Sequence, residues 1–109
     1  MTAEAAAVLP LLVGVALGLV WVVGLAVAQV RLVDASRDVA RGVARGEATS
    51  AAVRAARREA PRATRFEVGR QGDRVVVRAT AEVQGPGGLF AFLPGVHLST
   101  TATTAQEPG

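Results

Sequence analysis

The stretch AAAVLPLLVGVALGLVWVVGLAVAQV, residues 5–30, decides the fold of this 109-residue chain. Its 26 residues carry no formal charge, and Arg31 follows directly after it. The hydrocarbon core of a bilayer is about 30 Å thick, and about 20 apolar residues cross it as an α-helix. The stretch therefore predicts a transmembrane helix over residues 1–30, and it leaves residues 31–109 for one small domain.

The rest of the chain is rich in arginine and poor in side chains that bind metals. All 12 cationic residues are arginines, the net charge is +3, and acidic residues are interleaved with them. A nucleic-acid site needs basic residues gathered on one face, usually with aromatic side chains that stack on bases. The chain has no cysteine and one histidine, His97, which excludes a disulfide framework and a multi-histidine metal site. The composition predicts no nucleic-acid partner and no cofactor or metal.

Beyond residue 30 the apolar residues recur at helical spacing. Leu32, Val39 and Val43 fall on one side of a helix, and charged residues fall on the other. The spacing predicts that the helix continues over residues 31–45, with Gly46 as the residue that ends it.

A second, shorter helix is expected over residues 50–59. Thr49 or Ser50 is the expected N-cap, because a side-chain oxygen there can accept a hydrogen bond from a free backbone N–H. Pro61 is expected to end this helix, because proline cannot continue it.

After Pro61 the apolar pattern changes to a period of two, which is typical of half-buried strands. Val75 and Val77 face one way in the clearest strand, and Arg74 and Arg78 face the other. The chain from residue 84 to 95 is rich in glycine and proline and is expected to be a loop. The sequence predicts an α+β fold, in which a three-stranded antiparallel sheet packs on the amphipathic half of the long helix. The expected strands cover about residues 64–69, 74–84 and 96–104.

Three interpretations of the apolar stretch remain open. It is a signal sequence cleaved after Ala28, a plain membrane anchor, or a helix that lies first in the membrane and later in a protein assembly. The last interpretation draws on small residues one turn apart, which allow helices to approach closely. These candidate packing residues are Gly14, Gly18, Gly24 and Ala28.

No motif in the chain predicts catalysis. His97 would need a partner acid or nucleophile to act as a general base, and it is expected to be an exposed strand residue beside Ser99. We expect no enzymatic activity and no small-molecule substrate. Glu4 is the residue of interest instead, because it is the only charged side chain ahead of the apolar stretch.

Residues 2–10, Thr-Ala-Glu-Ala-Ala-Ala-Val-Leu-Pro, lead into the long apolar helix and resemble the N-terminus of TadE-like pilins. These are small pilin-like proteins of tight-adherence (Flp-type) pilus systems. The segments VDASRDVAR (33–41), ARGE (44–47) and GDRVVV (72–77) are similar to the actinobacterial branch of that family.

The resemblance implies a minor pilin or pilus-assembly protein that is structural rather than catalytic. In this family a prepilin peptidase removes a short basic leader, and a glutamate stands fifth in the mature chain. The resemblance implies that Glu4 has this role and meets the N-terminal amine of a neighbouring subunit. It also implies other pilins and pilus-assembly proteins as partners. The location it implies is a single pass through the cell membrane, with an extracytoplasmic head and a place in an extracellular pilus.

The sequence departs from that pattern at three points. Glu4 is fourth rather than fifth, no leader glycine precedes it, and Ala5 stands where phenylalanine is common. We expect a start codon further upstream, which would add a basic leader. Without such a leader, the arginines after the apolar stretch favour a cytoplasmic head, whereas the resemblance implies an extracytoplasmic one. The alternative functions are a membrane-anchored binding module unrelated to pili and a secreted protein cleaved after Ala28.

Overall fold

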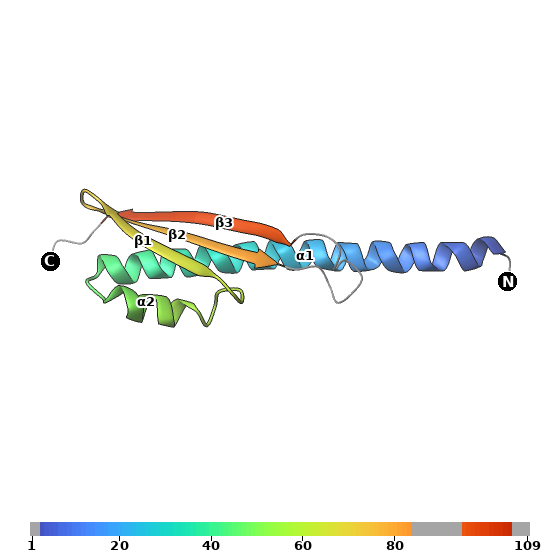
Figure 1. Ribbon diagram of the computed structural model, residues 1–109, viewed down its shortest axis with the longest axis horizontal. Helices are drawn as coiled ribbons and strands as arrows, with labels where there is room; N and C mark the ends of the chain where they lie inside the picture. The colour runs from blue at the N-terminus through green and yellow to red at the C-terminus, as the bar shows by residue number, and fades with distance from the viewer. Residues whose placement is uncertain (1–2, 84–94, 106–109) are drawn as a thin grey trace.

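The computed structural model describes residues 3–83 and 95–105. It contains a long helix, a short helix and three strands, and Figure 1 shows them along one elongated body. This confirms the α+β fold. The expected loop falls almost entirely on residues 84–94, which lie outside the described residues. The elements are α1 (Ala3–Ala44), α2 (Thr49–Ala56), β1 (Arg65–Gln71), β2 (Arg74–Val83) and β3 (Val96–Ala105).

The helix α1 runs unbroken through 42 residues, about 63 Å at the usual rise of an α-helix. It sets the shape of the molecule, which measures 73 × 21 × 18 Å. No residue from 3 to 31 is buried. This first half is long and apolar enough to cross a membrane, and Figure 1 shows it projecting away from the other elements.

The second half of α1 forms the centre of the head. Leu32, Val39 and Val43 are at most 1% exposed. Val39 and Val43 form a buried cluster with Val75 and Val77 of β2. Leu32 forms a second cluster with Ala79 and Ala81 of the same strand. In Figure 1, α2 and β3 lie on opposite sides of this half of α1. The apolar stripe expected over residues 31–45 is therefore confirmed as the core, and the helix ends one residue earlier, at Ala44.

The sheet is an antiparallel meander in the order β1-β2-β3. Alternate residues of β2 face α1 and are buried, because successive side chains of a strand point to opposite faces. Val96, Leu98 and Thr100 on β3 are half-buried on the same side. The three expected strands are confirmed, with ends that differ by one or two residues. β1 extends to Gln71 because Gly72, at φ 62°, makes the tight turn into Arg74.

The expected bounds and cap of the second helix were wrong. α2 spans Thr49–Ala56 rather than 50–59, and its N-cap is Ala48 rather than Thr49 or Ser50, without a side-chain hydrogen bond. The preceding turn decides this, because Gly46 at φ 95° ends α1 and Glu47 then bonds back to the carbonyl of Gly42.

α2 ends five residues before Pro61 because its last turn is tied to β1 instead. The Arg57 Nη1 donates to the carbonyl oxygen of Thr64 at 2.9 Å, and its guanidinium lies 5.6 Å from the ring centre of Phe66. These contacts fix the path from α2 into the sheet.

Candidate functional site: the exposed half of α1

Glu4 lies in the first turn of α1 and is exposed. A carboxylate is favoured there, because the free N–H groups at a helix N-terminus carry partial positive charge. The head begins about 42 Å away along the helix, at Leu32. Glu4 is therefore remote from every other ionisable side chain of the described residues, and any specific partner has to come from another part of the chain or another molecule.

The candidate packing glycines leave room for a side chain. A methyl group built on Gly14, Gly18 or Gly24 meets no atom within 4 Å. The described part of the chain therefore gives no internal reason for glycine at these positions. No other helix of residues 3–83 or 95–105 touches these positions, so helix packing there would involve another part of the chain or another molecule.

The four candidate packing residues do not all lie on one side of the helix, because Gly24 departs from the rest. At about 100° per residue, Gly14 and Gly18 fall within about 30° of the mean direction of Leu32 and Val43, the side that faces the sheet. Gly24 lies about 90° away from that direction by the same arithmetic. Gly14 and Gly18 thus extend the head-facing side of α1, and Gly24 opens onto another side.

Sequence reasoning missed a half-buried stripe in the apolar stretch. It lies on the head-facing side of α1 and comprises Leu17, Gly18, Trp21, Leu25, Ala28 and Gln29. The Gln29 Nε2 donates to the carbonyl oxygen of Ser99 on β3 at 3.5 Å. Contacts with the sheet therefore begin before residue 31, where the boundary between span and head was expected. The sequence offered one sign of this contact, because Gln29 is the only amide side chain in the apolar stretch.

A second feature that the sequence did not reveal is a close approach of the two helices at Gly42. A Cβ atom added there would collide with the Glu47 Oε2 and lie 3.1 Å from the Cβ of Ala52. Gly42 is buried, unlike the glycines of the exposed half. Glycine at this position is therefore explained by packing inside the head.

The head carries few groups that could do chemistry. His97 is exposed, as expected, and lies opposite Glu82 in a shallow surface hollow that Arg65 also lines. Within the described residues, no group of three or more histidine, aspartate or glutamate side chains could hold a metal ion.

Two carboxyl groups meet between the second half of α1 and the segment that follows α2. A hydrogen bond to Asp38 and the negative charge of that group raise the pKa of Glu59 above its ordinary value, and desolvation and the charge of Asp34 add to the effect. The pair lies on the exposed surface, so water screens much of this interaction.

Comparisons of the chain with protein-family models, with curated proteins and with solved structures find no match.

Proposed function

We propose that this protein is a TadE-like minor pilin or pilus-assembly protein of a tight-adherence system, structural rather than catalytic. The exposed half of α1 is its membrane anchor, and its head lies on the extracytoplasmic side. The observation that carries the proposal is the first half of α1, which is apolar, has no buried residue, continues unbroken into the head and bears one charge, Glu4, in its first turn. The sequence resemblance around residues 2–10 supplies the family.

The position of Glu4 suits a residue that acts during assembly rather than insertion. It lies about 40 Å from Arg31 along the helix, which exceeds the thickness of the hydrocarbon core. In the membrane its carboxylate therefore lies at the interface opposite the head, where ionisation costs little. When apolar helices gather into a filament, the same carboxylate enters low-polarity surroundings and needs a cationic partner, such as the N-terminal amine of a neighbouring subunit.

Deleting the gene in the native cells and restoring it with variants tests this function. We expect deletion to reduce surface filaments counted by electron microscopy, and Glu4→Ala to restore few of them while reaching the membrane fraction normally. Glu67→Ala, which removes an exposed carboxylate from the outer face of the sheet, is the matched control and should restore filaments fully. Normal filament numbers after deletion would refute the pilus role, and normal numbers with Glu4→Ala would refute the role of Glu4.

A further inference from the structure

The sheet of the head extends past Arg31 and lies beside the last residues of the apolar stretch. Gln29 is hydrogen-bonded to the carbonyl oxygen of Ser99, as described above. Ser99 pairs across the sheet with Thr80, and Thr80 pairs with Arg65. This row of the sheet therefore lies level with Gln29, at the end of the head nearest the exposed half of α1.

The length of the apolar stretch agrees with this overlap. Residues 5–30 form about 39 Å of helix, about 9 Å more than the hydrocarbon core requires. Past the row of Thr80 and Ser99, β2 and β3 extend three further residues, to Val83 and Val96, about 10 Å along a strand. The sheet lies along one side of the excess length, where Ala28 and Gln29 are half-buried. About 20 residues, up to residue 24, then cross the hydrocarbon core.

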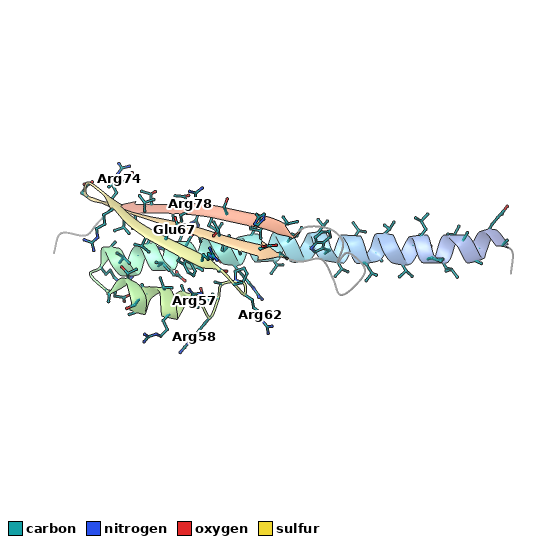
Figure 2. All side chains as sticks on the ribbon, viewed as in Figure 1. Arg57, Arg58, Arg62, Glu67, Arg74 and Arg78 are labelled. Carbon is teal, nitrogen blue, oxygen red and sulfur yellow. The ribbon has the colours of Figure 1, made fainter. Side chains whose placement is uncertain are left out.

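Three arginines gather at this end of the head: Arg31, Arg62 and Arg65. Arg31 lies about 10 Å along the helix beyond residue 24, and Arg65 is level with Gln29. Figure 2 shows Arg62 at the end of the head nearest the exposed half of α1. All three side chains are exposed, and none forms an ion pair or hydrogen bond with residues 3–83 or 95–105.

Arginines outnumber the carboxylates around them by one at this end. Glu82 lines a surface hollow with Arg65, and Asp34 and Glu59 line another with Arg31 and Arg58. The headgroup layer adds about 5–7 Å on each side of the hydrocarbon core. A long arginine side chain spans the remaining gap while its apolar stem lies along the protein surface. The guanidinium groups therefore reach the depth of lipid phosphates.

We propose that Arg31, Arg62 and Arg65, the collar arginines, bind the phosphate groups of anionic phospholipids and hold the head on the membrane surface. A guanidinium matches phosphate oxygens with two parallel hydrogen bonds, and an anionic leaflet attracts basic residues beside a membrane helix. This inference rests on the membrane anchoring in the proposed function, and it does not depend on the pilus role.

Lipid selectivity in a reconstituted bilayer tests the collar arginines. The full chain is placed in phosphatidylcholine bilayers that contain traces of spin-labelled phosphatidylglycerol or phosphatidylcholine. Electron paramagnetic resonance then measures the fraction of each probe held at the protein. We expect at least about a threefold preference for phosphatidylglycerol at low salt. The preference should fall to near equality at about 1 M salt, because salt screens the attraction.

A pair of double variants locates the effect. Arg62→Gln with Arg65→Gln should lower the preference at least about twofold, because two of the three collar charges are lost. Arg70→Gln with Arg74→Gln removes the same charge from the opposite end of the head, where Figure 2 shows Arg74, and should leave the preference unchanged. Circular dichroism of both variants checks that the fold is intact.

The possible failures are distinguishable. A chain that does not float with the vesicles would refute the anchoring on which the proposed function relies, and the collar with it. A reconstituted chain that holds both lipids equally would overturn the collar alone. Equal loss of preference in both double variants would also overturn it, because the effect would then follow net charge rather than position.

Discussion

The two halves of α1 form one unbroken helix, yet their surroundings differ completely. Between Ala3 and Val30 no residue is buried, whereas from Leu32 to Ala44 eight residues are. The first half is apolar on every side and needs lipid or other helices around it. The second half is apolar on a narrower stripe, which one sheet and one short helix cover. The comparison shows that the distribution of apolar residues around a helix, rather than their number, separates an anchor from a core element.

The largest expected effect comes from truncating the same side chain in each half. Leu32→Ala removes a fully buried side chain and should lower the free energy of unfolding of the head by about 2–5 kcal/mol. Leu19→Ala truncates a leucine that is 61% exposed and should leave it nearly unchanged. Chemical denaturation in mild detergent, followed by circular dichroism, measures both. Equal losses would mean that the exposed half also packs within the head.

A smaller effect is expected from filling the glycines. Gly42→Val should destabilise the head by about 1–3 kcal/mol, because the side chain would collide with Ala52 on α2. Gly24→Val meets no atom of the described chain and is the matched control in the other half. Thermal unfolding of the two variants checks the contrast. Unchanged thermal stability of Gly42→Val would contradict this prediction, because α1 and α2 would then move apart at no cost in free energy.

The smallest effect concerns pH and is confined to the head. The pKa of Glu59 is higher in the folded protein than in the unfolded chain. Its contribution to stability is therefore fully present below the unfolded pKa and is lost as the pH rises through the folded pKa. We expect a slight fall in melting temperature over that interval in the native chain. Glu59→Gln should reduce the fall, and an unchanged pH profile in this variant would contradict the assignment to Glu59.

Much of the fold followed from periodicity. The stripe of Leu32, Val39 and Val43 predicted the face of α1 that the sheet covers, and alternation predicted the buried face of β2. Both patterns are local, and burial follows them directly. The cap of α2 did not follow, because the turn at Gly46 and Glu47 sets where that helix begins, whatever side chain Thr49 or Ser50 offers.

The candidate site was predictable only in part. Glu4 could be singled out because it is the only charge ahead of the apolar stretch, and the small residues because they are spaced one helical turn apart. The described residues show no partner for Glu4 and no contact for a methyl group on the glycines. The overlap of the sheet with Gln29, the approach of the helices at Gly42 and the meeting of Asp38 with Glu59 depend on how distant segments pack. Single-residue patterns carry no information about such contacts.

The depth of Trp21 in a bilayer tests the central claim about α1 most directly. Trp21 is the only tryptophan in the chain, so its fluorescence in vesicles with lipids brominated at different depths reports one position. If residues 5–24 cross the hydrocarbon core, quenching should be greatest about 10 Å from the bilayer centre. A maximum about 5 Å from the centre would mean that the whole stretch to residue 30 lies in lipid. Quenching by a water-soluble quencher with none by the brominated lipids would contradict the account, because α1 would then lie outside the membrane.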